Sequence, residues 1–229
     1  MPYRRLPNTD DARIRSLKTA LLQAQLIGIH NLAFSLVNIQ NAKVLLAAME
    51  RSQNNYKMCL KEQVEANKNY QNLIKQSKLY ISHFVQVLNL SIIRGEIKLE
   101  HKTLYGLEIG SNSVPDLNTD VAILEWGEKL MRGETDRICK GGSPVYNPTI
   151  AKVRVHYEMF KNAHYNQKMY QQNTSRHLKS LVELRSKVDE IILIIWNEIE
   201  ENFKNEDPKN KINKCKEYGI IYYYKKGER

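Results

Sequence analysis

The chain has 229 residues, of which 42% are hydrophobic, so it can bury a core and is not a disordered protein. Its 35 Lys and Arg exceed its 25 Asp and Glu, which gives a formal net charge of +10 at pH 7. The longest apolar run, 191–196, is far shorter than the roughly 20 residues that cross a bilayer. Polar residues 8–11 follow the N-terminal arginines where a signal peptide has an apolar stretch, so we expect a cytoplasmic protein with no membrane partner.

The first predicted helix covers about residues 9–28. Asn8 or Thr9 is a suitable N-cap, and the two aspartates that follow favour the positive end of a helix dipole. Gly28 is a typical helix terminator. The residues expected on the apolar face of this helix are Ile14, Leu17, Leu21 and Ala24.

Two long helices are predicted because helix-breaking residues are absent from two long stretches. Neither Gly nor Pro occurs in 29–94 or in 149–207. Both stretches carry apolar residues at heptad spacing, which predicts helices over about 34–94 and 148–206 that pair antiparallel as in a coiled coil. The dipeptide Asn147-Pro148 predicts the start of the second helix, with Asn as the N-cap and Pro at the first helical position.

The apolar seams of both helices become polar in the middle, and two structures account for this. In one, both helices are continuous, and shorter helices cover only their two ends. In the other, the helices break at 52–55 and 173–175 to form a compact bundle. The polar seam residues are Gln53, Gln63 and Asn67 in the first helix and His164, Gln167, Gln171 and Thr174 in the second.

A shorter helix is predicted over about 119–139, after a loop at 95–118 that has a candidate strand at 103–107. The tail 207–229 contains β-prone tyrosines and isoleucines that could pair with this loop. Together the elements predict a single all-α domain over 1–229. Its expected architecture is an elongated antiparallel helical bundle of two ~60-residue helices, two shorter helices and a short C-terminal β-prone tail.

Six segments carry a family resemblance, and they are 1–10, 79–89, 116–119, 147–151, 189–201 and 217–219. In these segments the chain resembles a family of uncharacterised helical proteins from bacteria of the Bacteroides group. The resemblance spans nearly the whole chain. It implies a bacterial helical protein that forms one unit, and it carries over no functional residues because the family has no assigned activity.

The sequence predicts no catalytic, cofactor or metal site. Cys59, Cys139 and Cys215 are far apart and form no C-x-x-C, which indicates isolated reduced thiols. Cys139 has a cation beside it but no histidine to act as a base. His156 and His164 lie on one side of a predicted helix, but no Glu-x-x-His pair accompanies them.

A glycine-rich turn is the candidate anion site. The backbone N–H groups of Lys140, Gly141, Gly142 and Ser143 could form a concavity for an anion beside the N-terminus of the second long helix. Antiparallel pairing brings Arg94 to the same end of the bundle. The turn lacks the Walker spacing, so an ordinary turn without a ligand remains the alternative.

Three tyrosines are candidate contacts for a protein partner or a second copy of the chain. If Ile92 lies near Ile150, Tyr70 falls opposite Gln172, and Tyr170 falls on the same two-helix stretch, where no third helix covers it. Aromatic residues contribute strongly to interfaces. The alternative is that the rings cover the polar layer within one chain. The candidate residues are Tyr56, Tyr70 and Tyr170.

A non-enzymatic structural or interaction protein, an adaptor, is the leading functional hypothesis. A basic protein associated with nucleic acid is the second, since residues 1–20 have a net charge of +3 and residues 204–229 a net charge of +4. A helical enzyme with an unrecognised site is the third.

Overall fold

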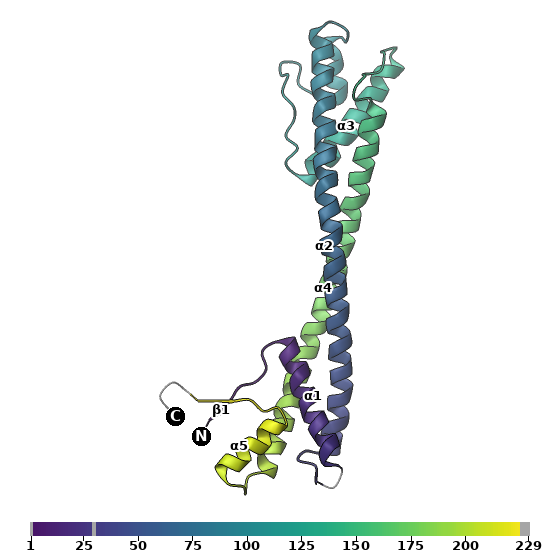
Figure 1. The fold of residues 1–229 in the computed structure, drawn as a ribbon. Helices are drawn as coiled ribbons and strands as arrows, with labels where there is room; N and C mark the ends of the chain where they lie inside the picture. The colour runs from purple at the N-terminus through teal and green to yellow at the C-terminus, as the bar shows by residue number, and fades with distance from the viewer. Residues whose placement is uncertain (1, 29–30, 225–229) are drawn as a thin grey trace. The chain divides into compact units, whose positions relative to one another are not determined.

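The computed structural model describes residues 2–28 and 31–224 (Figure 1). The predicted all-α fold with two long helices is confirmed. No helix within these ranges has both the length and the apolar content that crossing a bilayer requires. In chain order the elements are β1 (Tyr3–Arg4), α1 (Asp10–Ile27), α2 (Leu36–Ile93), the 3-10 helix η2 (Leu99–Tyr105), α3 (Asp120–Cys139), α4 (Ile150–Asn202), α5 (Pro208–Glu217) and β2 (Tyr222–Tyr223).

The two long helices are continuous. The backbone of α2 is helical through 52–55, and that of α4 is helical through 173–175. The alternative with broken helices is therefore wrong. Neither segment contains Gly or Pro, so no residue there interrupts the helical hydrogen bonds.

The residues group into two compact units, and the boundaries between them fall inside α2 and α4. Unit 1 consists of residues 1–60 and 173–229, and unit 2 consists of residues 61–172. Each unit has its own hydrophobic core. The fully buried apolar residues of unit 1 include Leu17, Ala42, Met49, Leu181, Ile195 and Trp196, and those of unit 2 include Ile81, Phe84, Leu88, Tyr105, Ile123 and Phe160.

Ion pairs hold α1 against α4 in unit 1. Arg13 donates to both carboxylate oxygens of Asp189 at 2.7 and 2.8 Å. Arg185 likewise donates to both oxygens of Asp10, each at 2.7 Å. The hydroxyl of Thr9 caps α1, as one of the two predicted alternatives had it. The first turn of α1 therefore serves both as a helix start and as an anchor on α4.

Part of the polar middle of the long helices finds partners within unit 1. The amide of Gln53 donates to Asp11 in the first turn of α1 at 2.7 Å. The hydroxyl of Thr174 donates to the backbone carbonyl of Cys59 at 3.3 Å. Both polar side chains are buried, so these hydrogen bonds offset the cost of removing them from water.

The C-terminal part of unit 1 differs from the prediction. Residues Pro208–Glu217 form α5, where the side chain of Asp207 caps the helix and Pro208 occupies its first turn. Tyr222–Tyr223 is a strand, but it pairs antiparallel with Tyr3–Arg4 and not with the loop at 95–118. The predicted pairing was wrong because strand preference alone does not identify a partner at the other end of the chain.

In unit 2, two glycines inside α3 allow tyrosine side chains to approach the helix backbone. A Cβ at Gly127 would lie 2.2 Å from Cδ2 of Tyr157. A Cβ at Gly133 would lie 2.6 Å from Cδ1 of Tyr105 and 2.8 Å from the carbonyl oxygen of Leu104. Both tyrosines are fully buried, so these glycines allow α4 and η2 to pack closely on α3.

The loop between α2 and α3 contains η2, and the predicted strand at 103–107 is wrong. Lys102 of η2 is fully buried. Its Nζ donates to the backbone carbonyl of Ser111 at 2.7 Å and to Oδ1 of Asn112 at 2.8 Å. The lysine thus ties the second half of the loop to η2. Strand propensity does not reveal a contact of this kind between a side chain and a loop.

The start of α4 also differs from the prediction. The helix begins at Ile150, and the N–H of Lys152 donates to the carbonyl and, at 3.4 Å, to the hydroxyl of Thr149. Asn147 has a left-handed backbone, with φ 48°, and the bond to Pro148 is cis. An N-cap residue has an extended backbone, so Asn147 is not the N-cap.

Candidate functional site

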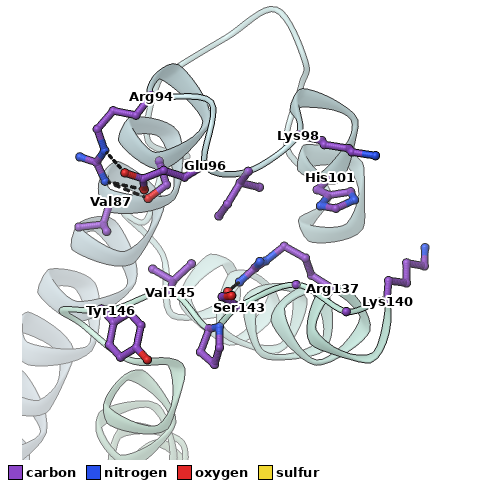
Figure 2. Close-up of a pocket in the computed structure, with 15 residues that line it drawn as sticks. Val87, Arg94, Glu96, Lys98, His101, Arg137, Lys140, Ser143, Val145 and Tyr146 are labelled. Carbon is purple, nitrogen blue, oxygen red and sulfur yellow. Dashed lines mark hydrogen bonds and ion pairs between the residues drawn. The ribbon is translucent and has the colours of Figure 1, made fainter.

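A pocket of about 620 Å³ lies in unit 2 (Figure 2). Its walls come from the C-terminal part of α2, the segment that leads into η2, and the turn after α3. All five residues of the predicted anion site line this pocket. They are Arg94, Lys140, Gly141, Gly142 and Ser143.

Positive charge is concentrated in this pocket. Unit 2 contains fifteen Lys and Arg and twelve Asp and Glu, which gives a net charge of only +3. The pocket lining alone contains four of the cations and one carboxylate, that of Glu96. The rest of unit 2 is therefore nearly balanced, and the pocket carries its excess charge. The lining cations are Arg94, Lys98, Arg137 and Lys140.

A buried ion pair lies behind the lining. The side chains of Arg137 and Glu134 are 2% and 0% exposed. Nη2 of Arg137 donates to both oxygens of Glu134 at 2.9 Å, and Nε donates to the hydroxyl of Tyr105 at 2.8 Å. That hydroxyl donates to Glu134. Burial, together with the neighbouring carboxylate, raises the pKa of Tyr105, so its hydroxyl remains a neutral donor.

The same ion pair positions the turn that forms one wall of the pocket. Arg137 donates to the carbonyl of Ser143 at 2.7 Å, and the N–H of Val145 donates to Glu134 at 2.8 Å. Both charges of the pair thus hold the turn on α3. This pair was not predicted from the sequence. The available signal was the spacing of three residues between an acid and a base on one helix.

Three of the four backbone N–H groups of the predicted anion concavity are bonded to carbonyls of α3. The N–H of Gly141 donates to the carbonyl of Ile138 at 2.9 Å, and that of Gly142 donates to the carbonyl of Arg137 at 3.1 Å. The N–H of Lys140 is also bonded to carbonyls of α3. These three groups cap the C-terminus of α3, so they are not available to an anion. Moreover, α4 begins at Ile150 and contributes no residue to the lining.

Arg94 and Glu96 form an ion pair at the exposed edge of the pocket. Nε and Nη2 of Arg94 donate to the two oxygens of Glu96 at 2.7 and 3.0 Å. Hydrogen bonding to Glu96 raises the pKa of Arg94, and hydrogen bonding to Arg94 lowers the pKa of Glu96. Arg94 therefore stays charged, and in the free protein the carboxylate of Glu96 compensates part of its charge.

Three other side chains of the lining have polar atoms without a partner among the residues that the structure describes. Within the described part of the chain, the ammonium groups of Lys98 and Lys140 make no ion pair or hydrogen bond. Nδ1 of His101 is buried without a hydrogen-bond partner among the same residues. Figure 2 shows Lys98 and His101 on the η2 side of the pocket and Lys140 at the end of α3. Neither Lys98 nor His101 was predicted from the sequence to belong to this site.

Tyr70, a predicted partner contact, is buried within unit 2. Its ring stacks on Phe160 with the centroids 5.9 Å apart. Its hydroxyl donates to Asp120 at 2.5 Å and lies 2.8 Å from Nδ1 of His164. The pairing with Gln172 was therefore wrong by eight residues. Tyr70 is buried, and these contacts are all within the chain, so its ring is not exposed to a partner.

The other two candidate tyrosines belong to different units. Tyr56 is half-buried and packs against the core of unit 1, whereas Tyr170 is half-buried in unit 2. A partner contact at either residue stays a prediction.

The cysteines and histidines show no assembly for metal binding. Cys59 is half-buried, Cys139 exposed and Cys215 buried, and all three are free thiols. The ring of His156 stacks on Tyr80, with the centroids 3.9 Å apart. Among residues 2–28 and 31–224, no group of three or more His, Cys, Asp and Glu side chains could hold a metal ion.

Comparisons of the chain with protein-family models, with curated proteins and with solved structures find no match.

Proposed function

We propose that the protein is a non-enzymatic interaction protein, an adaptor, that binds an anionic group of a partner molecule in the basic pocket of unit 2. The observation that carries this proposal is the concentration of four cations and one carboxylate in a single concave lining. A cleft lined mainly by charges of one sign focuses the electrostatic field and attracts ligands of the opposite sign.

The bonding within the site supports binding as its role. Glu134, Arg137 and Tyr105 are bonded to one another and to the turn, so they hold the wall of the site in place. By contrast, Lys98 and Lys140 are exposed, and their charges are available to a ligand. The site therefore combines a rigid base with free cations at its opening.

Replacing both lysines, as Lys98→Gln with Lys140→Gln, is expected to weaken binding of an anionic ligand at least tenfold. Each lost charge-assisted hydrogen bond contributes about 1.5–3 kcal/mol, and about 1.4 kcal/mol corresponds to a factor of ten. Titration calorimetry at low ionic strength, with inorganic phosphate and a glutamate-rich peptide as probes, measures the effect.

The matched control is Lys68→Gln with Lys168→Gln. These lysines are also exposed and lie in unit 2, so the control has the same net charge. It should bind the probes as the wild type does. Equal loss of binding in both double variants would show that overall charge attracts the anion, and the pocket would then not be the site.

Association with nucleic acid is a second candidate function, favoured by the charge of unit 1. This unit contains twenty Lys and Arg and thirteen Asp and Glu, which gives a net charge of +7. Binding of DNA or RNA in a gel-shift assay should be strongest at low salt and fall steeply as salt displaces the protein from phosphates. If neither single- nor double-stranded nucleic acid is retarded at low salt, this candidate is wrong.

A further inference from the structure

We infer that the group bound in the basic pocket is a phosphate monoester carried on an apolar body, and that Gly142 leaves the space through which it reaches Arg137. This inference rests on the proposed function and specifies its ligand. It follows from the charge of the pocket, from the free edge of one guanidinium, and from the apolar part of the lining.

The charge of the site matches a dianion. The lining contains four cations and the carboxylate of Glu96, and the buried Glu134 compensates the charge of Arg137, so the pocket retains a net charge of +2. A phosphate monoester carries about −1.5 to −2 at pH 7 and offers three acceptor oxygens. A carboxylate carries −1 and offers two oxygens, which would leave one cation of the pocket without a counter-charge.

One edge of Arg137 remains for a ligand. Nε and Nη2 bond to Tyr105, Glu134 and Ser143, whereas Nη1 has no hydrogen bond within the described part of the chain. Arg137 nevertheless lines the pocket. An arginine nitrogen with free N–H groups is a strong donor to phosphate oxygens.

Gly142 leaves open the space beside that nitrogen. A Cβ at this position would lie 2.6 Å from Nη1 of Arg137. The backbone of Gly141 is left-handed, with φ 86°, and so favours glycine, but that of Gly142 is not left-handed. Glycine at position 142 is therefore explained by its contact with Arg137. Any side chain there would fill the approach to Nη1.

The remaining lining fits an apolar body. Val87, Ile97, Pro144 and Tyr146 lie in the same lining as the cations, and Tyr146 is largely exposed. The volume of about 620 Å³ is in the range of small-molecule sites, about 300–1,000 Å³. A lone phosphate ion would leave this apolar surface in contact with water. A phosphate attached to an aromatic or aliphatic group would cover it.

Titration calorimetry with three probes tests the ligand class. Phenyl phosphate should bind more tightly than inorganic phosphate, and benzoate, which has the same ring and a single charge, should bind at least tenfold more weakly than phenyl phosphate. The Tyr146→Ala variant should lose several-fold in affinity for phenyl phosphate and keep its affinity for inorganic phosphate. Because Tyr146 is largely exposed, this variant should fold as the wild type does.

Gly142→Ala tests the path to Arg137. This substitution should lower the affinity for phenyl phosphate and for inorganic phosphate at least tenfold. At Gly110 a Cβ would meet nothing within 4 Å, so Gly110→Ala should leave the affinity for both unchanged. Thermal unfolding of both variants checks that they are folded. If Gly142→Ala is unfolded, the comparison of phenyl phosphate with benzoate on the wild type still decides the ligand class.

The outcomes separate the two proposals. Equal affinity for benzoate and phenyl phosphate would overturn the phosphate assignment, and unchanged phosphate binding in folded Gly142→Ala would overturn the role of Gly142. Either result leaves the proposed function in place if the variant with both Lys98→Gln and Lys140→Gln still loses binding. If that variant binds every probe as the wild type does, the proposed function itself fails.

Discussion

The Glu134→Gln variant is expected to lose about 3–5 kcal/mol of its free energy of unfolding, because removing one partner leaves the other charge buried and uncompensated. Arg137 is 2% exposed, and its Nη2 bonds to both oxygens of Glu134. The glutamine side chain has nearly the same shape as glutamate, so the substitution leaves no cavity. The loss of stability therefore measures the contribution of the charge and its hydrogen bonds. Urea or guanidinium unfolding followed by circular dichroism measures it.

Two further variants show whether burial causes this loss. Glu125→Gln removes a carboxylate of α3 that is exposed and pairs with Lys129, so it should cost less than about 1 kcal/mol. Replacing both buried partners with apolar residues, as Glu134→Leu with Arg137→Met, should recover part of the stability. A loss below about 1 kcal/mol in Glu134→Gln would contradict the buried ion pair.

Gly133→Ala is expected to destabilise the protein by about 2 kcal/mol, although alanine is the better helix former. Helix propensity alone would add about 1 kcal/mol of stability. The new Cβ would, however, lie 2.8 Å from both the carbonyl oxygen of Leu104 and Cα of Tyr105, which are backbone atoms that cannot rotate away. Overpacking of this kind costs about 1–3 kcal/mol, and the fixed backbone places the cost at the upper end. Denaturant unfolding gives the value.

Gly110→Ala is the matched control for this substitution. A Cβ at Gly110 meets nothing within 4 Å, so the free energy of unfolding of Gly110→Ala should differ from that of the wild type by less than about 0.5 kcal/mol. If Gly133→Ala is instead more stable than the wild type, η2 does not pack against α3 as described.

The sequence was informative about the candidate site only where local features carried the information. The glycine-rich turn 140–143 was recognised from composition, and Arg94 was placed beside it because two antiparallel helices bring one end of each together. Arg137 was missed because its importance comes from burial against Glu134 and Tyr105, and Tyr105 lies 32 residues away in the chain. The N–H groups of the turn were misassigned, since their use as a cap of α3 depends on backbone geometry.

The sequence by itself determined that this protein is helical and where its two long helices run. Uninterrupted stretches without Gly or Pro and apolar residues at heptad spacing are local properties that locate α2 and α4, whereas the structure excluded breaks at 52–55 and 173–175. A local capping signal also marked the start of α1, where Thr9 caps the helix. These signals act within one or two turns, so no knowledge of distant contacts was needed.

Only the tertiary structure decided the register of the helices, the partner of the C-terminal strand and the composition of the pocket. A heptad seam fits a partner almost equally well after a shift of one or two turns, and the observed register depends on contacts such as Tyr70 with Phe160. Similarly, the close approach of Tyr105 to Gly133 sets the position of η2 and hence of Lys98 and His101. Each of these features depends on side chains that meet across long stretches of sequence, and their packing energy is absent from any local pattern.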